Sequence, residues 1–523
     1  MRFKKLTDDD KTHIKQIYLD KSLSFQERIN QLTSEYQKDE RTIRRWMIKL
    51  GVKERTDKVP EQLEIAKQKK HDKTKRRFIV TWAQANVSPH KLFLKNLEAY
   101  SAHISADLIV IAGRYSNYRE HLNKDTKESW ADEVLPYLCY SRCDLNNSIS
   151  ILGDIKIQPT NSCPLRGFEG MTDGRSSIIG HPRIELKTIP VMEGCPSKYL
   201  FTTGAVTKPY YTDSRAGKTG EFNHSLGAAI IEIKDNDIFF FRQITANDKT
   251  GEFIDLFFHV KDGIVSREDS VEAIALGDVH VANCDQKVVD VTLNHLFKRL
   301  HPKAIFIHDI IDSSSISHHH LHDPFLLHQQ EIDGTNSLEK EVNDMLDWLK
   351  QIEDYNIYIV KSNHDEHIDQ FLRDTDWRKM TTLKNAIPYM EYATATLKGK
   401  APNGIVPYII NQHYPKFKCL SYNDNILVKG WLMSAHGSVG ASGSRGSLMQ
   451  YSKLSTKALI GHSHVAQRIG GAASVGTCSK LRVDYNIGPS AWSNAHGVIN
   501  RLGKMQHIIF FRTKNGLEYT TLD

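Results

Sequence analysis

Apolar positions recur at helical spacing near the start of the chain and gather into short unbroken runs further on. Within residues 1–56, they fall at Ile14 and Ile17 and again at Ile29 and Leu32. Spacings of three and four residues place such side chains on one face of a helix. The segment is therefore predicted to form short amphipathic helices.

A third helix is predicted in ERTIRRWMIKLGV, after a short polar break. Ile43 and Met47 form its apolar stripe, and Gly51 is a natural C-terminal stop. Two helices joined by a short turn, with basic residues exposed on the second, are typical of a helix-turn-helix. A helical hairpin used for packing or self-association is the alternative. The candidate nucleic-acid contacts are Arg44, Arg45 and Lys49.

The next segment, residues 57–77, is rich in charge. Lys and Arg outnumber Asp and Glu in it, and the whole chain has a formal net charge of +7. The overall charge is weak support for a polyanionic partner, whereas a local basic run can contact a nucleic-acid backbone. The segment is predicted to be a basic linker, either a solvated spacer or part of a DNA-binding surface.

From Phe78 onward, apolar runs alternate with helical patterns. A strand in RFIVTWAQ, a helix in SPHKLFLKNLEAYSAHI and a second strand in ADLIVIAG predict a βαβ-like opening. Residues 78–265 are predicted to form an α/β domain of unassigned role. Polar groups after its strands, such as Gly113-Arg114-Tyr115, are more typical of turns than of a catalytic site.

Cysteine usage and hydropathy exclude several classes of protein. Seven cysteines are scattered along the chain without a CxxC pair, which argues against a disulfide framework and a thiolate zinc site. No apolar run reaches the ~18 residues that span a bilayer, and the charged N-terminus lacks the apolar core of a secretory signal. We therefore expect a cytoplasmic protein with no membrane partner.

Five short apolar strands in the C-terminal half end in residues that can bind metals. They lie in EAIALGDVH, KAIFIHDIID, YNIYIVKSNHDEH, WLMSAHG and KALIGHSH. A lone histidine after a strand is more often a structural residue. Five such ends in succession argue for one composite site, because open α/β sheets place their sites at the carboxyl ends of strands. The candidate residues are Asp278, His280, Asp309, Asp312, Asn363, His364, Asp365, His436, His462 and His464.

The order Asp-x-His, Asp-x-x-Asp, Asn-His-Asp, His-Gly and Gly-His-x-His resembles the calcineurin-like metallophosphoesterase family, which includes the SbcD-type DNA nucleases. The resemblance covers about residues 270–500. It implies an α/β fold in which residues 266–523 form a four-layered αββα sandwich around two divalent cations. By this resemblance, the first ion is held by Asp278, His280, Asp309 and His464, and the second by Asp309, Asn363, His436 and His462.

The resemblance also implies that Asp309 bridges the ions and that His364 is the catalytic histidine. Asp312 or Asp365 is expected to orient the His364 ring. Two cations can clamp the attacking and the leaving oxygen of an in-line displacement and supply hydroxide near neutral pH. Nitrogen and oxygen ligands without thiolate suit Mn, Fe or Zn, with Mg also possible. Mn is favoured because the nuclease branch of the family commonly uses it.

Two positions depart from the family pattern. His308 precedes Asp309 and Ser362 precedes Asn363 where the family usually has glycine. Because those glycines serve tight turns, the local geometry is expected to differ. His308 is interpreted as a supporting or packing residue rather than an extra ligand.

Two loops near these strand ends have open interpretations. The segment SSSISHHHLHDPFLLHQQEID holds five histidines and is either an exposed loop or a loop over the metal site that touches substrate phosphates. The Gly/Ser loop at 437–446 carries Arg445, a candidate nucleic-acid contact, since backbone amides in such loops can cradle phosphate. A loop without a chemical role is the alternative.

These features predict a metal-dependent hydrolase, a nuclease with DNA as its partner. The order of a helix-turn-helix-like segment, a middle α/β domain and this phosphoesterase also resembles phage early proteins, among them the pre-early DNases with which T5-like phages degrade host DNA in the host cytoplasm. A phosphatase or small-nucleotide phosphodiesterase is the alternative enzyme. A third hypothesis is a DNA-binding regulator with an inactive phosphoesterase domain. The complete set of predicted ligands argues against it. A homo-oligomer is expected by analogy alone.

Overall fold

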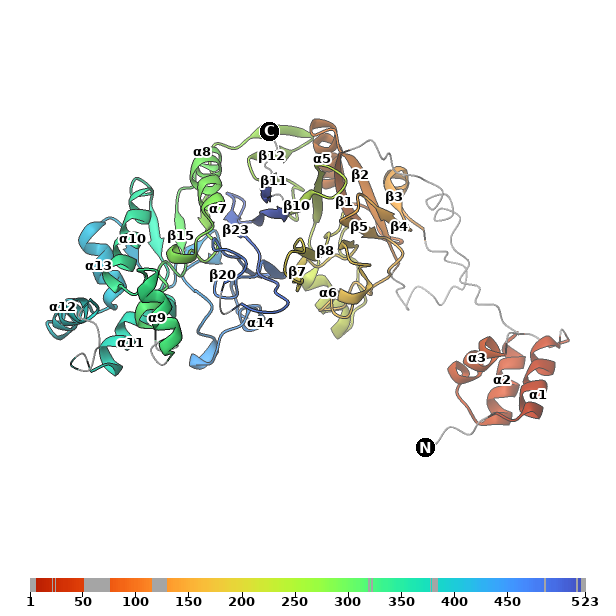
Figure 1. Ribbon diagram of the computed structural model, residues 1–523. Coiled ribbons are helices and arrows are strands. Elements are labelled where there is room, and N and C mark those ends of the chain that lie inside the picture. Colours follow the sequence, from red (N-terminus) through yellow and green to blue (C-terminus); the bar gives the residue numbers. More distant parts are fainter. Residues whose placement is uncertain are drawn as a thin grey trace. The chain divides into compact units, whose positions relative to one another are not determined.

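The computed structural model describes residues 6–20, 22–23, 25–50, 76–114, 129–317, 320, 323–376, 378, 384–483, 486–513 and 516–518. The chain divides into two compact units, Met1–Glu61 and Gln62–Asp523. Figure 1 shows the helices and strands of both.

The described part of the first unit consists of three helices, α1 (Asp8–Leu19), α2 (Phe25–Tyr36) and α3 (Glu40–Lys49). A capping box between Thr7 and Asp10 starts α1. The helical spacing predicted from the sequence is confirmed, because the predicted apolar residues form one buried core. That core consists of Ile14, Ile17, Ile29, Leu32, Ile43 and Met47.

The predicted DNA contacts of this region stay predictions. Arg44, Arg45 and Lys49 belong to α3, but their side chains fall outside the described ones. Of the predicted linker 57–77, the structure describes only its last two residues.

The second unit opens with the predicted strand, helix and strand. β1 (Arg77–Gln84) pairs in parallel with β2 (Asp107–Gly113), and α5 (Lys91–His103) connects them. The parallel pairing follows from the helical crossover between the strands. The sheet has the order β10-β9-β1-β2-β3 and is completed by β3 (Leu138–Cys139), β9 (Gly227–Ile233) and β10 (Phe239–Thr245).

A second sheet joins the segments that we predicted as separate domains, 78–265 and 266–523. Its order is β18-β19-β20-β22-β21-β7-β8-β6-β5-β4, and the junction is the antiparallel pair β7 and β21. From the first segment come β4 (Arg142–Asp144), β5 (Ile149–Leu152), β6 (Ser176–Ile179), β7 (Glu185–Ile189) and β8 (Lys198–Thr202). From the second come β18 (Leu427–Val428), β19 (Trp431–Leu432), β20 (Lys457–Ile460), β21 (Gln467–Ile469) and β22 (Ala472–Ser474).

The third sheet has the order β17-β16-β15-β14-β23-β24. Its strands are β14 (Ala273–Ala275), β15 (Ile305–Ile307), β16 (Ile357–Ile359), β17 (Lys418–Cys419), β23 (Ala495–Ile499) and β24 (Met505–Ile509). Phe306 from this sheet shares a buried apolar cluster with Trp431 and Leu459 from the second sheet. The second and third sheets therefore pack face to face around a common core.

Helices fill the connections of the third sheet. α10 (Leu338–Lys350) begins at the N-cap Ser337 and buries an apolar stripe that includes Val342 and Met345. The other helices of the described ranges are α6 (Arg215–Asn223), α7 (Gln286–Val291), α8 (Phe297–Leu300), α9 (Pro324–Ile332), α11 (His367–Asp374), α12 (Ala386–Leu397), α13 (Ile405–His413) and α14 (Leu448–Tyr451). The mixture of helices and sheets confirms the α/β class.

Small hairpins complete the described structure. β11 (Phe253–Asp255), β12 (Phe258–Lys261) and β13 (Ile264–Arg267) form one sheet, and β25 (Phe511–Thr513) pairs with β26 (Gly516–Glu518). All seven cysteines are free, as predicted. Within the described ranges, no helix has both the length and the apolar character needed to cross a membrane.

Candidate metal centre

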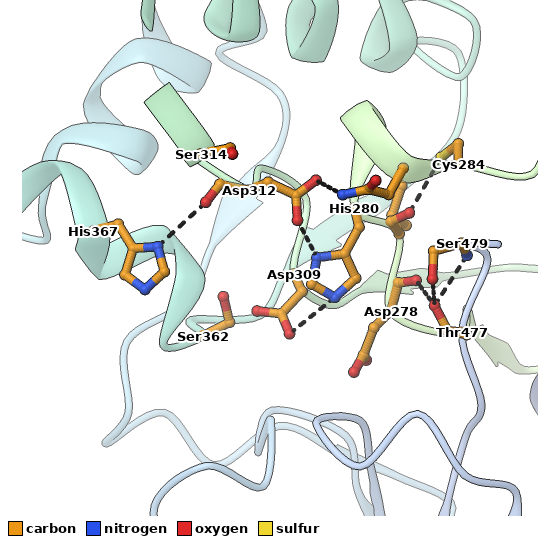
Figure 2. A network of polar contacts seen from close by, with 12 residues as sticks. Asp278, His280, Cys284, Asp309, Asp312, Ser314, Ser362, His367, Thr477 and Ser479 are labelled. Atoms are coloured by element: carbon orange, nitrogen blue, oxygen red, sulfur yellow. Dashed lines mark hydrogen bonds and ion pairs between the residues drawn. The ribbon is translucent and has the colours of Figure 1, made fainter. Parts of the chain in front are cut away.

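The predicted metal-binding residues lie in loops that follow five strands of two sheets. β14, β15 and β16 run parallel in the third sheet, and β19 and β20 run parallel in the second. Because parallel strands end at the same edge of a sheet, these loops meet. Figure 2 shows Asp278, His280, Asp309 and Asp312 converging from the third sheet.

The converging side chains form a buried cluster with short separations. His280 Nε2 lies 3.0 Å from His464 Nε2 and 3.6 Å from Asp309 Oδ2. Asp278 Oδ2 is 3.2 Å from His464 Nε2, and Asp309 Oδ2 is 3.2 Å from His436 Nε2. All five residues are buried. The loops thus bring carboxylates and imidazoles from both sheets into one small volume.

Three groups of these side chains could hold a metal ion, since the ligand atoms within each group lie within 4.8 Å of one another. Asp278, His280, Asp309 and His464 form the first group, and they are the four residues that the family resemblance assigns to one ion. The remaining groups are Asp278, His308 and His436, and His280, Asp312 and His364.

Many polar atoms of the cluster form no hydrogen bond with any described residue. These atoms include both carboxylate oxygens of Asp278 and of Asp309. They also include both ring nitrogens of His436 and of His308, and the Oδ1 atom of Asn363. Buried polar atoms in folded proteins are nearly always hydrogen-bonded, because an unpaired one costs free energy. Carboxylate, imidazole and amide oxygen are ordinary ligands of divalent cations, so this donor set fits a metal centre.

The backbone of the cluster is strained. His280, Asp309, His462 and His464 have φ values of 48°, 45°, 70° and 54°, in the left-handed region that costs non-glycine residues about 1–3 kcal/mol each. Such strain persists where the surrounding structure enforces it, and it concentrates at functional sites. A Cβ atom on Gly461 would lie 2.2 Å from Asp278 Oδ1, so the Gly-His-x-His turn requires its glycine.

Facing charges set the protonation of the cluster. Burial opposes ionisation of Asp309, but His436 and His364 outweigh it and hold the pKa of this carboxyl well below its usual range. Burial also opposes protonation of His280, yet Asp312 and Asp309 raise its pKa to about 9. The imidazolium forms thus balance the buried carboxylates. A bound cation would take over that balance, because metals and protons compete for the same ligand atoms.

Asp312 supports His280 from behind the cluster. The Asp312 carboxylate accepts a hydrogen bond of 2.8 Å from His280 Nδ1, which leaves Nε2 free to face the other ligand groups (Figure 2). His367 Nδ1 donates to the backbone carbonyl of Asp312 at 3.2 Å. Shortly after Asp312 in the chain, the backbone N–H groups of Ser314 and Ser315 donate hydrogen bonds to the Glu341 carboxylate on α10. Burial raises the pKa of Glu341 to about 7.

The predicted catalytic residues lie beside this cluster. The His364 ring is 4.8 Å from the His280 ring, centroid to centroid, and burial lowers its pKa. Asp365 is buried, and burial raises its pKa to about 7. Its described hydrogen bond is made by its backbone N–H to Ser362 Oγ, so Asp312, rather than Asp365, contacts the clustered histidines.

The remaining predicted residues lie at the edge or outside. His462 is partly exposed, with its ring 5.2 Å from that of His436. Arg445 is exposed and lies outside the three groups. His308 and Ser362 do not adopt left-handed backbone conformations, so neither position needs the glycine of the family pattern.

Glu341 and His367 were not predicted as site residues. Glu341 lies on helix α10 and follows no apolar strand, whereas His367 ends the segment YNIYIVKSNHDEH but was not chosen as a candidate. A pocket of about 460 Å³ beside His436 was also not predicted. Tyr422, Tyr451 and the Gly/Ser loop line it.

The fold and the site together define an α/β protein with a buried His/Asp cluster that could hold metal. Comparison with known proteins adds a phage relationship. The chain is 29% identical over 464 residues to Protein A1 of Escherichia phage T5, covering 84% of this chain and 82% of that protein. No protein-family model and no solved structure matches the chain.

Proposed function

We propose that the chain is a two-metal-dependent phosphodiesterase and that its substrate is DNA. The observation that carries this proposal is the buried cluster of carboxylates and imidazoles at five strand ends, with its unpaired ligand atoms. Two packed sheets with helices in their connections are compatible with the αββα sandwich of calcineurin-like metallophosphoesterases. The similarity to a phage T5 protein supports a phage origin, and action in the host cytoplasm is part of the proposal.

Each ligand side chain has a proposed place. Asp278, His280 and His464 would hold one ion, Asn363, His436 and His462 the other, and Asp309 would bridge them. When bound, the ions would activate a water molecule and stabilise negative charge on the phosphate. Mn is the preferred metal, with Fe, Zn and Mg as alternatives.

The charge of the site suits a phosphodiester anion. Two carboxylates, Asp278 and Asp309, face two divalent cations, so the loaded site keeps a positive charge of about +2 to attract the substrate. Asn363 adds an oxygen without adding negative charge. His364 lies beside the cluster with its ring 4.8 Å from that of His280, and in its protonated form it would donate a proton to the leaving oxygen.

DNA contacts outside the centre are proposed for the basic residues. Arg44, Arg45 and Lys49 on α3 and Arg445 on the Gly/Ser loop would supply affinity for phosphates that does not depend on base sequence. A homo-oligomer remains part of the proposal by analogy.

Plasmid degradation tests the proposal. The purified protein is incubated with DNA and Mn, Mg, Zn or EDTA, beside Asp309→Ala and the matched control Asp344→Ala, which changes an exposed residue of α10. We expect metal-dependent loss of plasmid that disappears in Asp309→Ala and persists in the control. Intact DNA with every metal, combined with cleavage of bis(p-nitrophenyl) phosphate, would overturn DNA as the substrate and favour a small phosphodiester.

A further inference from the structure

A pocket of about 390 Å³ lies at the end of β20 opposite the metal centre. Lys457 begins β20 and lines the pocket, whereas His462 follows the other end of that strand. The four residues of β20, at ~3.3 Å per residue, separate the two ends of the strand by roughly 10 Å. Arg468 on β21 and Lys504 in the turn before β24 also line it. The pocket is therefore distinct from the metal centre.

The lining is positively charged. Among the residues that line it, Asp248 is the one acid, against the cations Lys457, Arg468 and Lys504. Arg183 also lines the pocket, but its guanidinium pairs with Glu185 at 3.0 Å.

His224 adds no charge to this lining. Its Nε2 donates to the Thr207 carbonyl, and its Nδ1 accepts from the Tyr211 hydroxyl. Burial lowers the pKa of His224 to about 4, so the ring is neutral near pH 7. The pocket thus has an excess of two positive charges from Lys457, Arg468 and Lys504 against Asp248.

Arg468 is the distinctive member of the cluster. Its side chain is buried, with 6% of the residue exposed, and its guanidinium donates to the carbonyls of Gly470 and Met505. Among the described residues, no carboxylate forms an ion pair with it, and burial is the one cause that shifts its pKa. Buried arginines are normally paired with an acid, because an unbalanced buried charge is costly.

The cations of the pocket oppose one another. Burial lowers the pKa of Arg468 to about 10. Burial also lowers the pKa values of Lys457 and Lys504, and repulsion from Arg468 lowers both further. An anion bound between these side chains would relieve both effects.

We propose that this pocket binds a phosphate group carried by a nucleotide or by the end of a nucleic-acid strand. Its volume lies in the range of small-molecule sites. A small anion can enter and reach the buried Arg468, whereas the phosphates of an intact duplex lie on a convex surface. The remaining N–H groups of Arg468 and the two lysine ammonium groups can donate to the oxygens of a phosphate. The inference is independent of the metal centre and of the proposed phosphodiesterase activity.

Titration calorimetry tests the site on the full-length protein in EDTA, so that metal-bound phosphate does not contribute. The probes are inorganic phosphate, 5′-dAMP and unphosphorylated deoxyadenosine. We expect the first two to bind and deoxyadenosine not to bind. The double variant Lys457→Gln/Lys504→Gln should weaken binding about tenfold or more, while Lys453→Gln, an exposed lysine outside the pocket, should leave it unchanged.

Two further measurements locate the ligand and its source. Crystals soaked in tungstate should show an anomalous peak between Arg468 and Lys504. A 5′-phosphorylated oligonucleotide that binds more tightly than 5′-dAMP assigns a strand end, and the reverse order assigns a free nucleotide. Absence of phosphate binding, equal binding by the double variant, or a tungstate peak elsewhere would overturn the site.

Discussion

Two buried polar clusters of the same unit satisfy their charges in opposite ways. Around Arg242, the guanidinium donates to Asp255 at 2.8 and 3.1 Å and to Glu232 at 2.7 Å. Asp255 also accepts hydrogen bonds from Tyr100 and Gln506. Burial opposes ionisation of Asp255, but Arg242 outweighs it and lowers the pKa of that carboxyl. This network is complete within the protein.

The metal centre has the same burial but is incomplete. The carboxylate oxygens of Asp278 and Asp309 accept no hydrogen bond from the described residues, and His436 has both ring nitrogens in the same state. Unpaired groups of this kind are costly unless a ligand completes them. The comparison teaches that complete hydrogen bonding, rather than burial, separates a structural polar cluster from one that can accept a ligand.

Breaking the complete network should have the largest effect on stability. Arg242→Met leaves two buried carboxylates without a cation, so the free energy of unfolding should fall by about 3–5 kcal/mol. Urea unfolding of the full-length protein measures this value, with and without metal. Arg373→Met, an exposed change on α11, should stay within about 0.5 kcal/mol of the parent. A loss below ~1 kcal/mol in Arg242→Met would remove the contrast between the clusters.

Removing a charge from the metal centre should change the response to metal more than the metal-free stability. In EDTA, Asp309→Asn should lower the free energy of unfolding by less than Arg242→Met does, because the carboxylate balances the facing His436 but lacks the complete set of hydrogen bonds found around Arg242. Mn²⁺ at a hundred times its dissociation constant should stabilise the parent by about 2.7 kcal/mol and the variant by much less. Thermal unfolding with and without Mn²⁺ makes the comparison. Equal stabilisation of both proteins would place metal binding elsewhere.

The sequence predicted the incomplete cluster better than the complete one. Each ligand group follows an apolar strand, so short motifs such as Gly-His-x-His revealed them before the fold was known. Arg242 lies within a strand, and its partners come from other strands, so no local sequence motif predicts the network. The shared sheet of β7 and β21 was missed for the same reason. Periodicity reports that a strand is buried but does not identify its partner.

Removing the Asp312 carboxylate that holds the His280 ring should have an intermediate effect, on metal affinity rather than on stability. Asp312→Asn removes the negative charge that fixes the His280 ring, so Mn²⁺ affinity should fall about 10- to 100-fold while the fold is retained. Calorimetric titration with Mn²⁺ measures the affinity, and Asp344→Asn is the matched exposed control. Unchanged affinity in Asp312→Asn would mean that packing alone orients His280.

Replacing His308 should have the smallest effect on stability, and its sign tests the comparison between the two clusters. It is fully buried, neither ring nitrogen forms a hydrogen bond with a described residue, and burial lowers its pKa to about 4. Replacing such a ring by an apolar side chain of similar size removes the cost of two unpaired polar atoms. His308→Leu should therefore raise the metal-free unfolding free energy by about 1 kcal/mol.

The same variant reports whether His308 acts on the metal. Its ligand atom groups with those of Asp278 and His436, so His308→Leu should also weaken Mn²⁺ binding, but by less than Asp312→Asn. Urea unfolding in EDTA and Mn²⁺ titration provide the two values. Higher stability with unchanged affinity would make His308 a packing residue, as its place in the family pattern suggested. Lower stability would show that its nitrogens are paired within the protein and that it belongs with the complete cluster.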